Sequence, residues 1–500
     1  MTKNINKHPI DFIFHPQSIA VVGVSSSEPD GGNFMRALQN AGYHKKHKLY
    51  PINPKINKIG DLKCYPTILD CPNDIDYVIS RIPAPFVPEL LDQCIKKKVK
   101  TLHLFTAGFN ETGNKEREEL GIEIIKKAHK AGIRVIGPNC MGIYVPDEQI
   151  SFTEEAPPED SGNVFVASQS GVLAAEFIFR LASRGIRFSK VVSFGNAADL
   201  GVHDFLDYAA NDEQTKYVIT YIEGISNGKK FLSSLKKCAL KKPTIVLKGG
   251  VTDSGARAAS SHTGSLAGSA EIFTAICNQY GAITVESIEE AQDVLVTLQS
   301  SLSHINDSNI ISISSGGGNS VLSSDIMDKY GMRLSAIDKL VKIQLRKFIP
   351  LAGTSIDNPI DFGVGMDQVD ILRKLFVTLS KNKNVSSIFY SYGLMPWMKP
   401  NNSKASSLNS NKNNNIIKKL VTHKKIHTHS AEGLIIELSK IQKKIKVPIV
   451  IIHRSRISGS LDDINQIATL CLKHNVAFFD SITRASKIIK KITRWNKDRI

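Results

Sequence analysis

The chain lacks cysteines arranged for a disulfide framework. Its 7 cysteines lie at 64, 71, 94, 140, 238, 277 and 471, and none forms a Cys-x-x-Cys pair. An odd, scattered set of this kind is typical of reduced thiols in the cytosol. No apolar run reaches the about 18 residues that a membrane span needs, and residues 1–8 lack the apolar core of a signal peptide. We therefore expect a cytoplasmic protein that makes no membrane contact.

Arginine-rich runs with interleaved aromatic residues are also missing. The 64 Lys and Arg residues exceed the 47 Asp and Glu residues, which gives a net charge of +17, but the lysines are spread along the whole chain. Such a distribution favours a solvated basic surface. A nucleic-acid-binding protein would instead show tight binding with a steep salt dependence, and we rank that function last.

Acidic residues are absent from the segment 399–430, which is rich in Asn, Ser and Lys. This composition buries little surface and predicts a low-complexity insertion. Three histidines near its end adjoin lysines that would repel a cation, so we expect no metal site. The apolar content of 42% over 500 residues is ample for about three domains.

The first part of the chain alternates strand and helix patterns. Apolar strands are expected at 18–24, 48–52, 76–82, 100–105 and 133–137, with helices near 85–98 and 114–131. This alternation predicts an α/β fold with a parallel sheet covered by helices on both faces. The full Gly-x-Gly-x-x-Gly fingerprint is missing after the first strand, although glycines surround that turn. Ligands of such sheets bind beyond the carboxyl ends of the strands, where Lys55 could neutralise a phosphate.

A second α/β pattern begins near residue 162. The strand 163–167 enters the turn Ser168-Gln169-Ser170-Gly171, which precedes an apolar helix over 172–183. Free N–H groups at such a helix start bind anions, although an ordinary serine N-cap looks the same in sequence.

Two further strands of this second pattern end in chemically distinctive residues. The strand 217–222 ends at Glu223, and the strand 244–248 leads into a stretch of small residues around His262. We expect this stretch to be a mobile loop, in which His262 carries a group between sites. If the strands are parallel, Ser168, Glu223 and the histidine stretch all lie at one edge of the sheet, where Glu223 would fix the tautomer of His262. The simpler alternatives are a strand-end carboxylate bonded to backbone and a loop histidine bonded to its neighbours.

A third stretch of the chain repeats the same order of strand, glycine turn and helix. The strand 310–314 enters Ser315-Gly316-Gly317-Gly318, and a helix runs from there to about residue 330. This is a second candidate anion site, although a triple glycine could also be only a flexible turn.

Several motifs together resemble one family, the α subunits of NDP-forming (ADP-forming) acyl-CoA synthetases, which are relatives of succinyl-CoA synthetase. The motifs, in the family's order, are Gly-Pro-Asn-Cys-Met-Gly-Ile at 137–143, Ser-Gln-Ser-Gly at 168–171, Ser-Phe-Gly-Asn at 193–196, Tyr-Ile-Glu-Gly at 221–224, Lys-Gly-Gly at 248–250, Ser-His-Thr-Gly at 261–264 and Asn-Pro-Ile-Asp at 358–361.

The resemblance implies a CoA-binding Rossmann-like domain at 1–150, a flavodoxin-like domain at 151–303 and a second flavodoxin-like ligase domain at 304–500. It implies that His262 is the phosphohistidine, that Glu223 orients it, and that the turns at 168–171 and 315–318 hold phosphate. The positions expected near CoA are Gly23, Ser25, Lys55, Pro83 and Asn139.

The implied reaction interconverts acyl-CoA, ADP and phosphate with a carboxylic acid, ATP and CoA, through an acyl phosphate. The chain has no candidate for the family's ATP-grasp domain, so ADP or ATP with Mg²⁺ is expected on a partner β subunit. The alternative is a non-catalytic CoA- or acyl-CoA-binding regulatory or scaffold protein. One departure from the family is Arg81, which stands where an apolar strand residue is expected.

Overall fold

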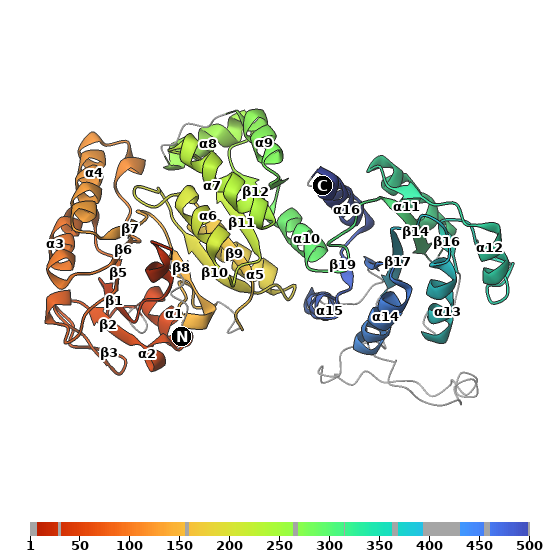
Figure 1. Cartoon of the computed structure of the whole chain (residues 1–500). Coiled ribbons are helices and arrows are strands. Elements are labelled where there is room, and N and C mark those ends of the chain that lie inside the picture. The colour runs from red at the N-terminus through yellow and green to blue at the C-terminus, as the bar shows by residue number, and fades with distance from the viewer. Residues whose placement is uncertain are drawn as a thin grey trace, which may run out of the picture. The chain divides into compact units, whose positions relative to one another are not determined.

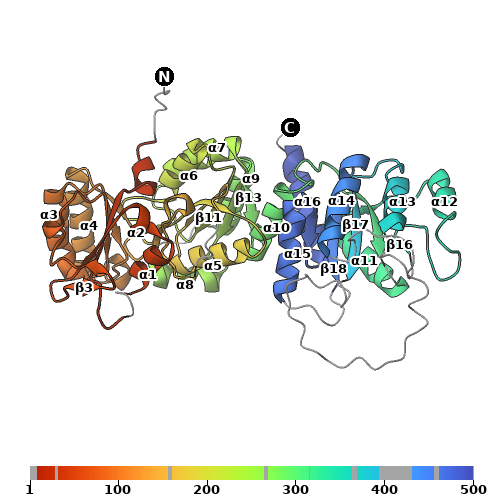
Figure 2. The same cartoon turned by 90° about the horizontal axis from the view of Figure 1, so that it is seen from below.

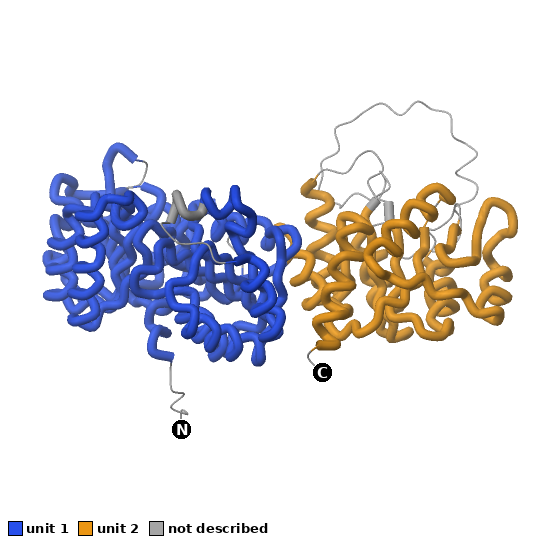
Figure 3. Tube along the Cα trace, turned by 90° about the horizontal axis from the view of Figure 1, so that it is seen from above, with its two compact units in different colours: residues 1–182, 186–291 blue, residues 183–185, 292–500 orange. Residues whose placement is uncertain are grey.

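A computed structural model of the chain contains three main sheets, each flanked by helices (Figure 1). It describes residues 8–28, 32–155, 160–263, 269–314, 316–362, 369–393, 431–454 and 461–498, with the backbone alone at 259–263, 392, 393 and 454. The predicted insertion at 399–430 lies outside these residues. The chain divides into two compact units, which are residues 1–182 with 186–291, and residues 183–185 with 292–500 (Figure 3).

The first sheet is parallel throughout and has the strand order β2-β1-β5-β6-β7. Figure 2 shows α3 and α4 on one side of this sheet and α1 and α2 on the other, as the alternating pattern predicted. The elements are β1 (Ser18–Val22), α1 (Asn33–Asn40), α2 (Tyr43–Lys46), β2 (Lys48–Ile52), β5 (Tyr77–Ser80), α3 (Val87–Lys97), β6 (Thr101–Leu104), α4 (Lys115–Lys130) and β7 (Arg134–Ile136), with the hairpin β3 (Lys58–Ile59) and β4 (Leu62–Lys63).

The second sheet belongs to the same unit and has the order β13-β12-β11-β9-β10-β8. Its strands are parallel except for the edge strand β8, which pairs antiparallel with β10. The elements are β8 (Gly142–Tyr144), β9 (Val164–Ser168), α5 (Gly171–Ala182), β10 (Phe188–Ser193), α6 (Val202–Asn211), β11 (Tyr217–Ile222), α7 (Gly228–Lys241), β12 (Thr244–Lys248), α8 (Asp253–Thr263), α9 (Ala270–Gln279), β13 (Ile283–Val285) and α10 (Ile288–Leu298).

The third sheet lies in the other unit and has the order β15-β14-β17-β18-β19, with β16 pairing to β14. One core cluster joins one face of this sheet to α12, α13, α14 and α15. The elements are β14 (Asn309–Ser314), α11 (Gly317–Lys329), β15 (Arg333–Leu334), α12 (Lys339–Leu345), β16 (Ile360–Asp361), α13 (Val369–Leu379), β17 (Ser387–Gly393), α14 (Ala431–Ile445), β18 (Ile449–Arg454), α15 (Leu461–Lys473), β19 (Ala477–Phe479) and α16 (Ile482–Asp498).

The three sheets share one strand order. Numbered along the chain within each sheet, the parallel strands on the main path run 2-1-3-4-5, which is the flavodoxin-like order. The order reverses beside the first strand of each sheet, so the switch points lie between β1 and β5, β9 and β11, and β14 and β17. Ligands of open parallel sheets bind beyond the carboxyl ends of the strands at such points. The α/β fold class is thus confirmed, and it points to three places in which to look for a site.

Burial explains why the strand predictions succeeded. Every residue of β1, β5, β6, β9 and β10 is buried, because helices cover both faces of these sheets. Such strands read as continuous apolar runs rather than as alternating ones. Among the described residues, no helix has both the length and the apolar character that a membrane crossing requires.

One local prediction is wrong. The small residues around His262 were expected to form a loop, but α8 runs over Asp253–Thr263 and places His262 in its last turn. Three alanines precede the histidine in this helix, and alanine is the best helix former although it is also small. The side chain of His262 and residues 264–268 lie outside the described part of the structure.

Candidate functional site

The switch point of the second sheet is built around a buried glutamine. The side-chain oxygen of Gln169 accepts hydrogen bonds from the backbone N–H groups of Glu223 (2.8 Å) and Gly224 (3.1 Å). Gln169 and Glu223 are 7% and 8% exposed, and strand register places Tyr221 opposite Ser168. The ends of β9 and β11 are therefore tied together, and the predicted adjacency of Glu223 and the Ser168 turn is confirmed.

The carboxylate of Glu223 has a neighbouring donor on its own strand. The Tyr221 hydroxyl donates to Oε1 of Glu223 at 3.1 Å, and burial together with the Glu223 charge raises the pKa of Tyr221. The tyrosine therefore stays protonated and can only donate to the carboxylate. A Cβ at Gly249 would lie 2.5 Å from the Tyr221 hydroxyl, so glycine leaves room for this contact.

Lys248 lies beside the same carboxylate. Its Nζ donates to the backbone oxygens of Glu223 (2.8 Å) and Gly249. Burial lowers the pKa of Lys248, and the Glu223 charge opposes that change. The edge of the sheet thus combines a buried carboxylate with a half-buried ammonium group.

The turn at 168–171, which is predicted to bind an anion, leads into the start of α5. The Ser168 hydroxyl is buried and donates to the backbone oxygen of Ser170 (2.7 Å), while Oγ of Ser170 caps the helix by accepting from the N–H of Leu173 (3.3 Å). A Cβ at Gly171 would lie 2.7 Å from the Met141 side chain. Because these hydroxyls serve the turn itself, an anion here would meet mainly backbone N–H groups.

The helix that carries His262 contacts the 3₁₀ helix Asn110–Thr112, which follows β6. Asn196 holds this segment, because its Nδ2 donates to Oδ1 of Asn110 (2.9 Å) and Oε2 of Glu111 (2.7 Å). Sequence reasoning gave no role to Asn110 or Glu111. The available signal was their position just after a strand whose carboxyl end faces the predicted ligand.

The turn that follows β7 completes this side of the site. Asn139 has φ +58°, and its N–H donates to the backbone oxygen of Thr106 at 3.0 Å. The Asn139 side chain reaches Oδ1 of Asn196 at 3.5 Å. Cys140 is buried, and burial raises the pKa of its thiol, so Cys140 packs in the wall of the site and is not an activated nucleophile.

The predicted CoA-contacting residues Gly23, Lys55 and Pro83 follow three neighbouring strands of the first sheet, β1, β2 and β5. Gly23 has φ +92°, and its N–H donates to the backbone oxygen of Ile52 at 3.0 Å. Lys55 and Pro83 are exposed, and the Ser25 hydroxyl lies 2.7 Å from that of Ser27. Asn139 follows β7 at the far end of this sheet, so the five residues share its carboxyl edge.

Arg81 occupies the switch point of the first sheet. Its Nη2 donates to both carboxylate oxygens of Glu28, at 3.1 and 2.8 Å, and the two side chains are 13% and 44% exposed. A Cβ on Gly32, which precedes α1, would lie 2.0 Å from Oε2 of Glu28 and 2.4 Å from Nη1 of Arg81. The departure from the family pattern therefore places a guanidinium group at the start of a helix, where phosphates bind.

The third sheet has a carboxylate at its glycine turn. The N–H of Gly316 donates to Oδ1 of Asp361 at 3.1 Å, and Gly316 has φ +94°. A Cβ at Gly317 or Gly318 would meet nothing within 4 Å, so those two glycines leave the helix start open. Ser315 lies outside the described residues.

Comparisons with known proteins agree with this arrangement. Residues 161–298 match the model of a succinyl-CoA ligase like flavodoxin domain, and residues 17–146 match that of a CoA binding domain. The acetate–CoA ligase [ADP-forming] II subunit alpha of Pyrococcus furiosus is 36% identical over 353 residues, which are 70% of this chain and 76% of that protein.

Other relatives are longer or have solved structures. The acetate–CoA ligase [ADP-forming] of Methanocaldococcus jannaschii is 40% identical over 357 residues, which are 71% of this chain but only 49% of that protein. The structure of the dinucleotide forming acetyl-coenzyme A synthetase 1 of Ca. Korarchaeum cryptofilum in complex with phosphate and ADP matches with a TM-score of 0.76 and 30% identity, over 98% of this chain and 97% of that one. The chain therefore belongs to the ADP-forming acyl-CoA synthetases of the succinyl-CoA ligase superfamily, as an alpha-type subunit.

Proposed function

We propose that this chain catalyses the reversible conversion of acyl-CoA, ADP and phosphate into a carboxylic acid, ATP and CoA, together with a partner subunit. The observation that carries the proposal is the strand order β12-β11-β9 of the second sheet. This order brings the anion-binding start of α5, the buried Glu223 and the approach to the His262 helix to one edge. A carboxylate, a histidine and a phosphate cradle are the parts that phosphoryl transfer through histidine needs.

The reaction proceeds in three steps. A phosphate oxygen attacks the thioester carbon, the C–S bond breaks, and CoA leaves as a thiolate to give an acyl phosphate. A ring nitrogen of His262 then attacks the phosphorus, the bond from phosphorus to the acyl oxygen breaks, and the carboxylate leaves. Finally an oxygen of the terminal phosphate of ADP takes the phosphoryl group from His262 and forms ATP.

Each group at the sheet edge has one role in these steps. Glu223 accepts a hydrogen bond from the N–H of the His262 ring nitrogen that does not attack, which fixes the tautomer. Gln169 holds the backbone around Glu223 in place, and the N–H groups of the 168–171 turn hold the phosphoryl oxygens. In the other unit, the turn Gly316-Gly317-Gly318 at the start of α11 is a second proposed phosphate-binding turn.

CoA binds along the carboxyl edge of the first sheet, and the match of residues 17–146 to a CoA binding domain supports this placement. Gly23 lets the backbone approach the diphosphate, Lys55 neutralises part of its charge, and Ser25, Pro83 and Asn139 contact the remainder. The cytoplasm, where CoA and ADP are available, remains the expected location.

ADP or ATP with Mg²⁺ binds an ATP-grasp domain on a partner β subunit. Two Pyrococcus furiosus relatives are named as alpha subunits, which supports a separate partner. The Methanocaldococcus jannaschii relative is about twice as long as the stretch that it shares with this chain.

Phosphorylation of the chain tests the proposal. The purified chain and its ATP-grasp partner are incubated with a series of acyl-CoAs, radiolabelled phosphate and Mg²⁺, and the protein is tested for an acid-labile, base-stable label. We expect the label in wild type and in the control His304→Ala, whose side chain is exposed in the other unit, and no label in His262→Ala. Label retained in His262→Ala would contradict the phosphohistidine. Binding of CoA without any label would favour the non-catalytic alternative.

A further inference from the structure

The strand that precedes α8 ends in a half-buried lysine. Lys248 is the last residue of β12, and strand register places it opposite Ile222 of β11. Its Nζ donates to the backbone oxygens of Glu223 (2.8 Å) and Gly249, which follow the ends of these two strands. The same nitrogen lies over the ring of Phe273 on α9, 5.9 Å from the ring centre. Groups from two neighbouring strand ends and from a helix therefore fix the place of this ammonium group.

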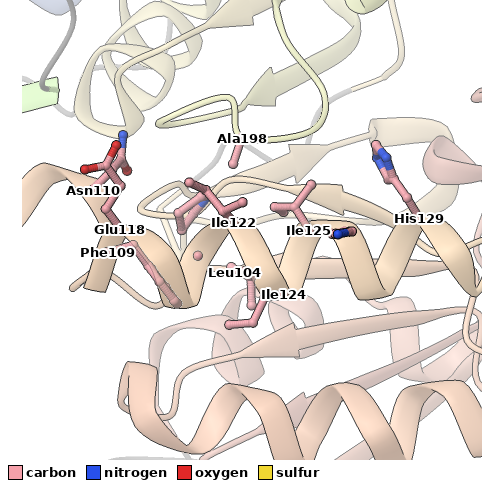
Figure 4. Close-up of a pocket in the computed structure, with 12 residues that line it drawn as sticks. Leu104, Phe109, Asn110, Glu118, Ile122, Ile124, Ile125, His129 and Ala198 are labelled. Carbon is pink, nitrogen blue, oxygen red and sulfur yellow. The ribbon is translucent and has the colours of Figure 1, made fainter. Parts of the chain in front are cut away.

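The charge of Lys248 is not taken up by an ion pair. Its contacts are the two backbone oxygens and the ring, and within the described part of the chain no carboxylate lies at ion-pair distance from it. Arg134, by contrast, contacts Asp199 at 2.9 Å. His129, which lies at one end of the cavity of about 490 Å³ beside α4, contacts the same carboxylate at 2.7 Å (Figure 4). A fixed cation that has no carboxylate bound to it is available to an anionic ligand.

Three other side chains meet at this edge of the sheet, and none of the three is a cation. Glu223 is a carboxylate, Tyr221 stays protonated and neutral, and the amide of Gln169 is uncharged. A phosphoryl group brings negative charge of its own, so Glu223 would repel it if the edge held no positive charge. Burial strengthens both this repulsion and its compensation, because less water is present to screen them. The place of Lys248 beside Glu223 suits a group that balances incoming negative charge.

We propose that Lys248 is the cation of the phosphoryl-transfer centre and that its charge offsets that of the phosphoryl group as His262 takes it up. This inference rests on the proposed function, to which it adds a residue. Positive groups that are fixed where negative charge gathers in the transition state stabilise it without further reorganisation, and phosphoryl transfer depends mainly on such groups. The two backbone hydrogen bonds of Lys248 set the position of the charge, and the charge acts on the phosphoryl group.

Three substitutions separate the charge of Lys248 from its hydrogen bonds. Lys248→Met removes both, Lys248→Gln keeps a donor for a backbone oxygen without the charge, and Lys248→Arg keeps the charge. The measurement is the single-turnover rate of His262 labelling by radiolabelled phosphate, with the ATP-grasp partner present and with the acyl-CoA that gives most label in wild type. We expect labelling to slow about 10²-fold in the Met and Gln variants and to stay within about tenfold of wild type in Lys248→Arg.

Lys242 provides a matched control at the other end of the same strand. It lies two residues before β12 and is half-buried, and its Nζ also donates to two backbone oxygens, those of Ala209 (2.6 Å) and Asp212 (2.5 Å). Lys242→Met therefore removes the same charge and the same kind of hydrogen bonds away from the proposed centre. Its labelling rate should stay within about twofold of wild type. Urea denaturation of both Met variants compares their losses of stability.

The outcomes distinguish this inference from the proposed function. A labelling rate in folded Lys248→Met within about twofold of wild type, or an equal slowing in Lys242→Met, would overturn the role of Lys248 and leave the proposed function standing. A wild-type rate in Lys248→Gln would also overturn it, because the hydrogen bond would then suffice without the charge. If Lys248→Met does not fold, the Gln and Arg variants decide. Wild type that acquires no label on His262 would overturn the proposed function, and the role of Lys248 with it.

Discussion

The second and third sheets have the same strand order and similar glycine turns, yet their switch points are chemically different. In the second sheet the turn itself supplies Gln169, whose uncharged amide oxygen accepts from the backbone N–H groups of Glu223 and Gly224 after the neighbouring strand. In the third sheet a carboxylate, Asp361, bonds directly to the N–H of Gly316 at the start of α11. The second sheet therefore keeps its helix start available to an anion, whereas the third already presents a negative group there.

The contrast shows that a glycine turn at a helix start does not by itself make a phosphate site. The neighbouring strand decides which charge the turn faces. After β11 the neighbour contributes backbone N–H groups that Gln169 satisfies, and on β16 it contributes Asp361. We infer that the second sheet forms the phosphoryl-transfer centre, and that the third sheet admits a phosphoryl group only in competition with its own carboxylate.

The largest effect is expected at Glu223. In Glu223→Gln the side chain keeps its shape but loses the charge that, in the proposed mechanism, stabilises the positively charged ring of His262 as the phosphoryl group is transferred. Phosphoryl transfer should slow about 10²- to 10⁴-fold, the range over which acid–base partners contribute. The measurement is the single-turnover rate of His262 labelling from acyl-CoA and phosphate. The control is Glu213→Gln, an exposed residue that precedes the amino end of β11. A labelling rate within about twofold of wild type would mean that Glu223 has only a structural role. The second sheet would then not differ from the third as a phosphoryl-transfer centre.

Gln169→Leu breaks the tie between β9 and β11. Two backbone N–H groups in a largely buried site would lose their acceptor, at a cost of about 1–3 kcal/mol each, reduced where water can replace the amide. We expect a loss of about 2–4 kcal/mol in the free energy of unfolding of the first unit, measured by urea denaturation. Gln279→Leu, at the exposed end of α9, is the control and should be nearly neutral. If Gln169→Leu and Gln279→Leu were equally stable, the side-chain amide of Gln169 would not hold the ends of β9 and β11 together.

Much of the fold could be predicted from the sequence because the covered parallel strands are apolar runs that end in glycine turns. The same logic predicted that the Ser168 turn and Glu223 lie at one edge, since β9 and β11 needed only to be parallel neighbours. Gln169 was predicted to contact phosphate, and the structure places its amide oxygen on the backbone of Glu223 and Gly224. That contact depends on strand register, which residue types do not specify.

Two further features were beyond sequence reasoning for other physical reasons. Arg81 and Glu28 are 53 residues apart in the chain and meet only because β1 and β5 are neighbours. The position of His262 at the end of a helix was missed because alanine and serine are small enough for a loop, while alanine also favours a helix. Composition alone does not decide between these two states.

Arg81 extends the comparison to the first sheet, where the switch point holds a cation and a carboxylate together. If the guanidinium binds a phosphate of CoA, Arg81→Gln should raise the dissociation constant of CoA about tenfold. Glu28→Gln should lower that constant, because the competing carboxylate is removed. Arg333→Gln is the control, since it breaks an exposed ion pair with Asp307 in the other unit. Unchanged CoA affinity in both first-sheet variants would make the Arg81–Glu28 pair a structural contact alone.

The smallest effect on stability is expected at Asp361. The sign of the change in the free energy of unfolding tests directly whether the second and third sheets differ in the charge at their helix starts. A carboxylate at a helix start is worth about 0.3–1 kcal/mol, so Asp361→Asn should lower the free energy of unfolding of the second unit by that amount. Asp328→Asn provides a control of opposite sign, because it removes a negative charge from the last turn of α11 and should stabilise the same helix slightly. Labelling of His262 should stay within about twofold in both variants, since we propose that transfer to the histidine takes place at the second sheet. A loss of label in Asp361→Asn comparable to that in Glu223→Gln would show that the two switch points act as one site, and that the charge on the third sheet serves catalysis rather than the helix.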